Sequence, residues 1–214
     1  MNSTLVVFAS KQEFNLVYPQ KSAVVASSTP LTIGSFDVAV CGVGLLEFAT
    51  NLAYQLSQRK YARVIMVGVC GAYPGRELEI GDVVRVETEV VGDMGVQERD
   101  GHFLPWGEVT GEPRIYSGGS PRELPLQLAA MRSVAGVSVN CCTGTVYLAQ
   151  RRCALFDADI ETMEGASFFA VCKRFGVSGY QFRAVSNIAT DRDTSTWRIP
   201  EAMAALKERV LDNL

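Results

Sequence analysis

The sequence is poor in the residues that most often bind transition metals. It has one histidine, His102, and six cysteines, at positions 41, 70, 141, 142, 153 and 172, with no Cys-x-x-Cys pair. A zinc site would therefore need unusual ligands. Most of the cysteines stand inside apolar runs such as residues 38–42, so we expect buried, reduced thiols.

Positive charge is also scarce. The 214 residues include 20 Lys and Arg against 23 Asp and Glu, a formal net charge of −3. This leaves no basic excess to neutralise phosphates and argues against a nucleic-acid partner. No run approaches the ~20 apolar residues that span a bilayer, and no basic segment precedes the short apolar run 5–9. We therefore expect a cytoplasmic protein with no membrane partner.

The chain does have a regular alternation of short apolar runs and amphipathic segments, which is typical of an α/β fold with a mixed sheet flanked by helices. Its length favours one domain, residues 1–214. We expect a turn at 68–75 and a long loop or flap at 92–120. The strands are expected at 5–9, 37–41, 63–67, 83–91, 136–140, 160–163 and 179–186, and the helices at 46–59, after 163 up to 174, and from about 200.

Small or polar residues follow several of these strands. In open α/β sheets ligands bind beyond the carboxyl ends of the strands, so these clusters predict a binding site. Gly42-Val-Gly44 lacks the third glycine of a dinucleotide fingerprint and is better interpreted as a turn. The other clusters are 68–71, Thr143-Gly-Thr145, Met163-Glu164 and Ser186-Asn187.

Two polar residues carry most of the information. Glu164 stands between an apolar strand and an apolar helix, where a carboxylate is costly to bury without hydrogen-bond donors. The residues alone leave two interpretations open, a cap for the helix N-terminus and an acid that binds a ligand. Asn187 also has two interpretations. It is either a residue of a helix cap or turn, or a residue that binds a ligand.

The order of five motifs resembles the purine nucleoside phosphorylase and nucleosidase superfamily over nearly the whole chain: Gly68-x-x-Gly71-Ala, Gly81-Asp82-Val, Thr143-Gly, Met163-Glu164-Gly-Ala and Arg183-Ala-Val-Ser-Asn187. The most similar branch is the bacterial nucleosidases that act on methylthioadenosine and futalosine. Within it, Ser-Asn followed by Arg192-Asp193 and Trp197 resembles the futalosine-cleaving members. The resemblance implies a three-layer, nucleoside phosphorylase-like fold with a central mixed, twisted, partly barrel-like sheet. It also implies a homodimer or larger homo-oligomer that binds a small nucleoside.

The resemblance assigns roles to single residues. Glu164 matches the carboxylate that accepts hydrogen bonds from the ribose hydroxyls, and Met163 matches the residue that packs on the sugar. Glu13 falls where nucleosidases keep the acid that activates water. Asn187 matches the residue that contacts the purine at N7.

Five further positions are matched to the nucleoside by the same resemblance. Tyr147 corresponds to an aromatic side chain that packs against the base, and Leu148 would offer its backbone. Val69, Cys70 and Gly71 match a turn that approaches the nucleoside.

The implied reaction is hydrolysis of the N-glycosidic bond by water that attacks C1′ of an oxocarbenium-like sugar, and it needs no metal or organic cofactor. Glu13 is expected to deprotonate that water, a contribution of around 10²–10⁴-fold. The charge of Glu164 would stabilise the sugar cation. For the futalosine-cleaving members, the products are hypoxanthine and dehypoxanthine futalosine, in menaquinone biosynthesis.

Asn187 differs from the Asp of adenine-specific nucleosidases. An amide can pair its NH₂ with a 6-oxo oxygen while its carbonyl accepts N7–H, which favours hypoxanthine over adenine. Futalosine also carries a carboxylate-bearing aromatic tail in place of the 5′-hydroxyl. Arg192, Arg198 and residues of 92–120 all stay open as partners of that carboxylate.

Three alternatives are weighed against futalosine hydrolysis. A phosphorylase would need arginines near the ribose, and residues 10–30 contain none, only Lys11 and Lys21. Cleavage of methylthioadenosine, S-adenosylhomocysteine or aminodeoxyfutalosine is the same chemistry on another substrate. A non-enzymatic nucleoside-binding module is disfavoured, because binding alone has no use for the acid at position 13.

Overall fold

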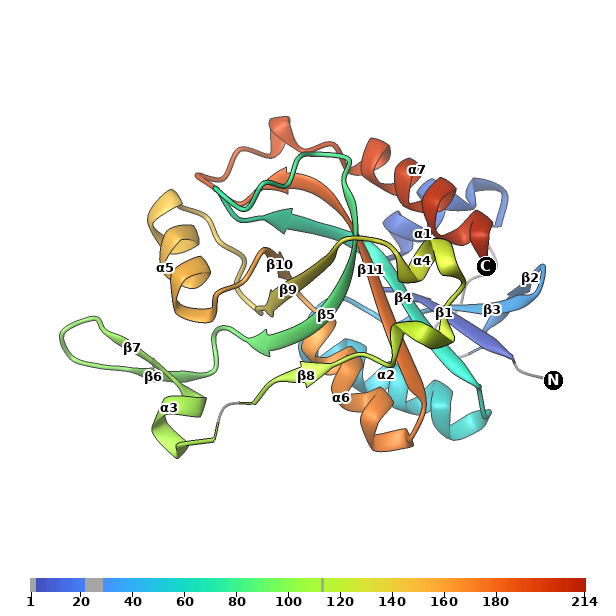
Figure 1. The fold of residues 1–214 in the computed structure, drawn as a ribbon, viewed down its shortest axis with the longest axis horizontal. Coiled ribbons are helices and arrows are strands. Elements are labelled where there is room, and N and C mark those ends of the chain that lie inside the picture. Colours follow the sequence, from blue (N-terminus) through green and yellow to red (C-terminus); the bar gives the residue numbers. More distant parts are fainter. Residues whose placement is uncertain (1–2, 22–28, 113) are drawn as a thin grey trace.

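The computed structural model describes residues 3–21, 29–112 and 114–214, and its centre is a nine-stranded mixed sheet (Figure 1). The strands follow the order β10-β9-β5-β11-β4-β1-β3-β2, and β8 pairs with β5. Their bounds are Thr4–Phe8 for β1, Leu31–Ile33 for β2, Phe36–Val40 for β3, Arg63–Ala72 for β4, Val83–Val91 for β5, Tyr116–Ser117 for β8, Ser133–Ser138 for β9, Ile160–Thr162 for β10 and Ser178–Ile188 for β11.

Part of the sheet closes on itself. β4 pairs with β11, β11 with β5, β5 with β9 and β9 with β10, and β10 returns to pair antiparallel with the end of β4. These five strands form what we call the strand ring. β1, β3 and β2 continue from the other edge of β4 as an open sheet. The expected mixed, partly barrel-like sheet is confirmed.

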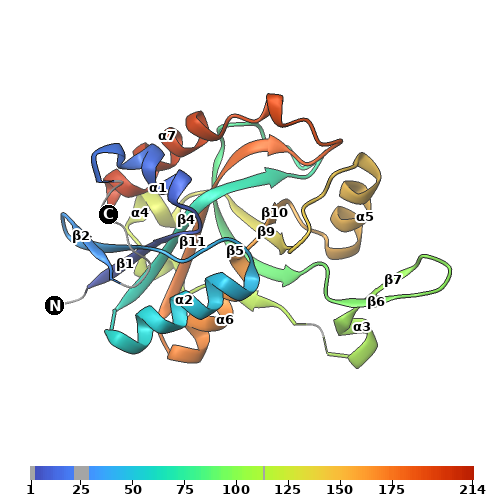
Figure 2. The same cartoon turned by 180° about the vertical axis from the view of Figure 1, so that it is seen from behind.

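Helices cover both faces of the open part of the sheet (Figures 1 and 2). Helices α2 and α6 pack together on one face, and α1 and α7 pack together on the other. Side chains of β1 point alternately to the two faces of the sheet and pack in both hydrophobic clusters. Leu5 and Val7 belong to one buried cluster, and Val6 and Phe8 belong to the other. The helices are Lys11–Val17 (α1), Leu45–Gln58 (α2), Trp106–Thr110 (α3), Leu126–Ala129 (α4), Val146–Phe156 (α5), Gly165–Phe175 (α6) and Ile199–Arg209 (α7).

The expected turn at 68–75 is wrong in its first half. β4 continues through residues 68–72, in parallel register with β11. The glycine at 68 reflects close packing rather than a turn: an added Cβ there would lie 2.7 Å from Glu13 Oε1 and 2.8 Å from Arg183 Nη1. Small residues can thus mark a strand that other side chains approach closely.

The expected loop at 92–120 contains short ordered elements within its described residues. Strands β6 (Gly95–Gln97) and β7 (Phe103–Pro105) form a hairpin, followed by α3 and β8. The hairpin and α3 stand out from the body of the molecule as an arm (Figure 1).

The six cysteines are all free, but the expectation that they are buried is wrong for two of them. Cys41, Cys70 and Cys172 are buried and Cys153 is half-buried, whereas Cys141 and Cys142 are exposed in the segment between β9 and α5. Across the described residues, no group of three or more His, Cys, Asp or Glu side chains could hold a metal ion. No helix in the same residues is long and apolar enough to cross a membrane.

Candidate active site

A cavity of about 270 Å³ lies at the carboxyl ends of β1, β4, β10 and β11. β1, β4 and β11 run parallel, so their carboxyl ends meet at one edge of the sheet, as the polar clusters in the sequence predict. β10 meets the end of β4 in the antiparallel direction. The cavity lining contains seven of the nine predicted site residues: Glu13, Val69, Cys70, Gly71, Met163, Glu164 and Asn187.

Glu13 is held at the N-terminus of α1 by a capping box. The Ser10 hydroxyl accepts a hydrogen bond from the Glu13 amide (3.1 Å), and Glu13 Oε2 accepts from the Ser10 amide (3.0 Å) and the Ser10 hydroxyl (2.9 Å). Glu13 Oε1 accepts from the Val69 amide on β4 (2.9 Å). The side chain is 7% exposed and lines the cavity. Helix α1 was not among the expected helices, although Ser10-x-x-Glu13 is a capping signature that the sequence shows.

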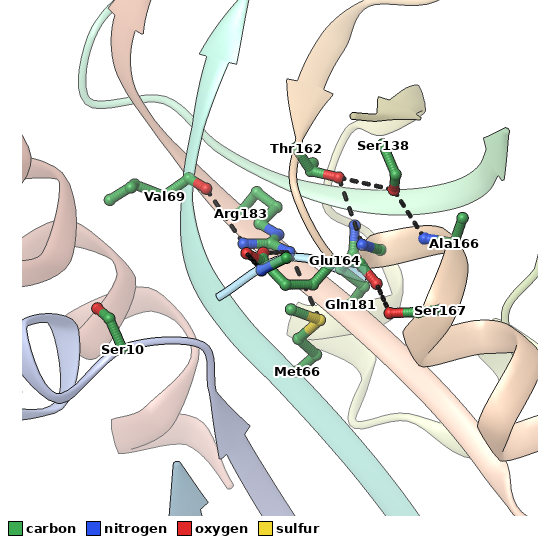
Figure 3. Close-up of polar contacts among 12 residues, drawn as sticks. Ser10, Met66, Val69, Ser138, Thr162, Glu164, Ala166, Ser167, Gln181 and Arg183 are labelled. Atoms are coloured by element: carbon green, nitrogen blue, oxygen red, sulfur yellow. Dashed lines mark hydrogen bonds and ion pairs between the residues drawn. The ribbon is translucent and has the colours of Figure 1, made fainter. Parts of the chain in front are cut away.

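Glu164 stands at the position that precedes α6, but its side chain does not cap that helix. Its Oε1 accepts from the Gly44 amide (3.1 Å), and its Oε2 forms a buried ion pair with Arg183 Nη2 (3.2 Å; Figure 3). Burial raises the pKa of the Glu164 carboxyl and the nearby charge of Glu13 adds to that, while Arg183 and the Gly44 amide oppose it. The carboxylate thus remains directed at the cavity rather than at its own helix.

Arg183 lies at the centre of the site, although the motif that contains it gave no role for it. It is 1% exposed, and besides Glu164 it donates to the Val69 carbonyl (3.2 Å) and contacts Met66 Sδ (3.5 Å). Gly68 leaves the space in which Glu13 and Arg183 approach β4 together. The sequence does contain a signal for this role, a charged residue inside an apolar strand. A guanidinium buried there needs an acidic partner.

Asn187 ends the run of polar residues on β11, after a register shift between Val185 and Asn187. Its Oδ1 accepts from the Ser186 hydroxyl (2.8 Å), and its amide nitrogen lies 3.4 Å from the Ile188 carbonyl. An added Cβ at Gly71, its neighbour on β4, would lie 3.2 Å from Asn187 Nδ2. Asn187 is therefore neither a helix cap nor a turn residue; it lines the cavity from a strand.

Tyr147 and Leu148 lie in the first turn of α5, outside the cavity lining. The Tyr147 ring is 66% exposed and stacks with Arg151, whose guanidinium carbon is 5.7 Å from the ring centroid. The Leu148 amide donates a hydrogen bond to the Thr145 hydroxyl, which caps α5 (3.2 Å). Contact of these two residues with a base stays a prediction.

A second buried ion pair supports the segment that leads into α5. Glu161 Oε2 lies 2.9 Å from Arg152 Nη1, and the Thr143 amide and hydroxyl donate to the same carboxylate at 2.7 and 2.5 Å. The Tyr73 hydroxyl completes the cluster at 3.0 Å. Because Thr143 and Glu161 line the cavity, this cluster fixes one of its walls.

Of the three candidates for the tail carboxylate, Arg192 and Arg198 both adjoin residues of the cavity lining. The guanidinium carbon of Arg192 lies 5.8 Å from the ring centroid of Trp197, which lines the cavity. Arg198 donates instead to the carbonyls of Ser195 and Trp197. No described residue of 92–120 lines the cavity.

Comparisons with known proteins identify the family. The family model described as the phosphorylase superfamily matches residues 20–212. The chain is 32% identical to the futalosine hydrolase of Thermus thermophilus over 79% of this chain and 76% of the relative. It is 31% identical to the futalosine hydrolase of Streptomyces coelicolor over 82% and 77%, respectively.

A solved structure with the same fold is the 5′-methylthioadenosine/S-adenosylhomocysteine nucleosidase of Neisseria meningitidis, in complex with methylthio-immucillin-A. Its TM-score is 0.76, with 18% identity over 98% of this chain and 97% of that chain. Likeness at this level of identity shows the three-layer architecture.

Proposed function

Since this chain belongs to the phosphorylase superfamily, we propose that it is a nucleosidase that hydrolyses the N-glycosidic bond of futalosine. Two relatives above 30% identity that carry this activity in their names support the substrate. The observation that carries the proposal is the pair Glu13 and Glu164, two buried carboxylates that line one cavity and lie close to the same guanidinium, that of Arg183.

Glu13 acts as the base in this proposal. An ionised carboxylate has about four lone-pair sites, and the capping box and the Val69 amide occupy only some of them. These are three bonds, so about one site, on Oε1, remains to hold a water molecule in the cavity. The existing bonds also fix the carboxylate, so that the water is positioned before the sugar begins to ionise.

Glu164 holds the ribose hydroxyls and places its charge near the developing sugar cation. The Gly44 amide and Arg183 oppose the effect of burial on its pKa and favour the ionised form that this role needs. Its stabilising effect grows as positive charge develops on the sugar, so it lowers the barrier and not only the energy of the bound substrate. Met163, beside it, packs on the sugar.

Asn187 receives the purine. Its amide can donate to the 6-oxo oxygen and accept a hydrogen bond from N7–H. Because an amide does not release a proton, the proton that N7 gains as the bond breaks comes from solvent water, and hypoxanthine then leaves as the neutral base. Val69, Cys70 and Gly71 approach the nucleoside from a strand rather than from a turn. The tail of futalosine packs against Trp197, and Arg192 receives its carboxylate.

Water, not phosphate, is the acceptor in this proposal. Within the described chain, Arg183 is the only arginine or lysine that lines the cavity, and it is already paired with Glu164. A phosphate dianion would need further donors. The enzyme would act in the cytoplasm as a homo-oligomer and supply menaquinone biosynthesis.

The decisive experiment measures base release from futalosine, aminodeoxyfutalosine, methylthioadenosine and inosine, each with and without phosphate. We expect futalosine to react with the highest kcat/KM, to release hypoxanthine, and to need no phosphate. A sugar 1-phosphate product would identify a phosphorylase. A higher kcat/KM for methylthioadenosine would identify the alternative nucleosidase activity.

A further inference from the structure

A buried acid that the proposed mechanism does not use lies inside the strand ring. Glu89, on β5, is 0% exposed and accepts hydrogen bonds from three other strands of the ring. Gln181 Nε2 on β11 donates at 2.7 Å, the Ser138 hydroxyl on β9 at 2.9 Å and the Thr162 hydroxyl on β10 at 3.0 Å. No cation among the described residues forms an ion pair with it.

The surrounding backbone leaves room for this carboxyl group and for nothing larger. An added Cβ at Gly165 would lie 2.0 Å from Glu89 Oε1, and one at Gly136 would lie 2.6 Å from the same atom. These glycines belong to the start of α6 and to β9. A buried charge without an ion-pair partner is costly, and apolar packing of similar volume would be more stable.

The two hydroxyls that donate to Glu89 also cap α6. The Ala166 amide donates to Ser138 Oγ at 2.8 Å (Figure 3). The Gly165 amide donates more weakly to Thr162 Oγ1 at 3.4 Å. The first amides of a helix have no acceptor within the helix. Here the capping that Glu164 does not provide comes from β9 and β10.

Each hydroxyl has one hydrogen, so its direction decides what the oxygen can accept. A carboxylate at position 89 only accepts, and it therefore draws the hydrogens of both Ser138 and Thr162 towards itself. Their lone pairs are then left for the amides of Gly165 and Ala166. Glu164 immediately precedes these two residues, so its position depends on that arrangement.

We propose that Glu89 is a positioning residue: by orienting the Ser138 and Thr162 hydroxyls, it fixes the N-terminus of α6 and with it the Glu164 carboxylate. This inference rests on the proposed role of Glu164 with the ribose. When Glu89 is protonated or replaced by an amide, it must donate a hydrogen to a neighbour. A hydroxyl that receives this hydrogen must redirect its own, either towards the other hydroxyl, 3.1 Å away, or towards the α6 amides. In either case the lone pairs that accept from the amides of Gly165 and Ala166 are redirected, and the capping of α6 is weakened.

Protonation of Glu89 falls in an accessible range. Burial raises its pKa to about 7 against the opposing effects of Gln181, the Arg183 charge and the two hydroxyls. The charged or titratable groups that act on it are Arg183 on β11 and Cys70 on β4. Its contacts from β9, β10 and the start of α6 do not titrate.

The test compares Glu89→Gln with a matched control, Glu87→Gln, which changes an exposed acid two residues away on the same strand. In the ligand-free protein, hydrogen exchange should become faster at the amides of residues 165 and 166 in Glu89→Gln only. The KM for the cleaved nucleoside should rise about five- to tenfold, as expected for loss of one buried hydrogen bond, with kcat less affected. In the wild type KM should rise as the pH falls through 7, and this dependence should be absent from Glu89→Gln.

Ser138→Ala is the second variant, because it removes one cap while Glu89 remains. It should also speed exchange at residue 166 and raise KM. Unchanged exchange in Glu89→Gln would overturn the proposal, whatever Ser138→Ala shows, and so would faster exchange with unchanged KM. Exchange is read without substrate, so it tests the connection from Glu89 to α6 even if futalosine is not cleaved; in that case the proposed function fails separately.

Discussion

Glu89 should make the folded protein less stable as the pH rises through neutrality. Burial raises the pKa of Glu89 to about 7 in the folded state, against an ordinary value of 4.5 for an exposed glutamic acid. Between these values the folded chain binds the proton and the unfolded chain does not, so the free energy of unfolding falls with increasing pH. At ~1.36 kcal/mol per pKa unit, the loss attributable to this one group is about 2.5 kcal/mol between pH 5 and pH 8.

Glu89→Gln removes this titration while keeping the shape of the side chain. We expect the stability of the variant relative to the wild type to increase by about 2.5 kcal/mol from pH 5 to pH 8. Urea unfolding at several pH values measures it, provided that the m-value stays constant. Taking the difference between variant and wild type cancels the titration of the other groups, including Glu164.

Glu87→Gln is again the control, because Glu87 is exposed on the same strand and hydrogen-bonded to Ser133. Its difference from the wild type should stay nearly flat over the same range. Parallel pH profiles for the wild type and Glu89→Gln would refute the reasoning, since Glu89 would then titrate alike in the folded and unfolded chains.

Four further outcomes are expected. Glu13→Gln should lower kcat by around 10²–10⁴-fold while calorimetry still detects nucleoside binding; full activity would show that another group is the base. Gly68→Ala adds a Cβ 2.7 Å from Glu13 Oε1 and should lower kcat/KM by about 10²-fold. The control is Gly144→Ala, where an added Cβ meets nothing within 4 Å and kcat/KM should stay near the wild-type value. Asn187→Asp should shift the ratio of kcat/KM for aminodeoxyfutalosine over futalosine upwards by about tenfold or more, because the wrong base leaves polar groups unmatched; an unchanged ratio would remove Asn187 from base recognition. Arg192→Met should raise KM for futalosine about tenfold through loss of a charged hydrogen bond, and an equal rise for inosine, which has no tail carboxylate, would contradict the assignment.

The sheet could be predicted from the sequence because its signals are local. Runs such as 5–9 and 37–41 show the apolar character of buried strands, and their positions are confirmed to within a few residues. The extension of β4 through Gly68 was not predictable in that way. Glycines normally indicate a turn. Here they leave space for side chains of α1 and β11 that pack closely against β4.

Most residues of the cavity lining that were predicted came from motifs. The roles of the buried residues that support the lining were not predicted. Glu164 and Asn187 stand out as polar groups at the ends of apolar strands. Arg183 and Glu89 lie inside strands, where the sequence shows a charge but not its partners. Those partners lie far along the chain: Glu89 is 92 residues from Gln181, and Arg183 is 114 residues from Val69.

The placement of β11 has a consequence for the order in which the chain can assemble. It is the last strand in the sequence, yet it lies between β4 and β5, which precede it by about a hundred residues. During synthesis, the edges of β4 and β5 that pair with β11 therefore stay unpaired until the C-terminal quarter of the chain has been made and β11 inserts between them. Pairing over such separations is slow. The cavity can form only at that final step, so nucleoside can stabilise the completed molecule but cannot guide its earlier folding.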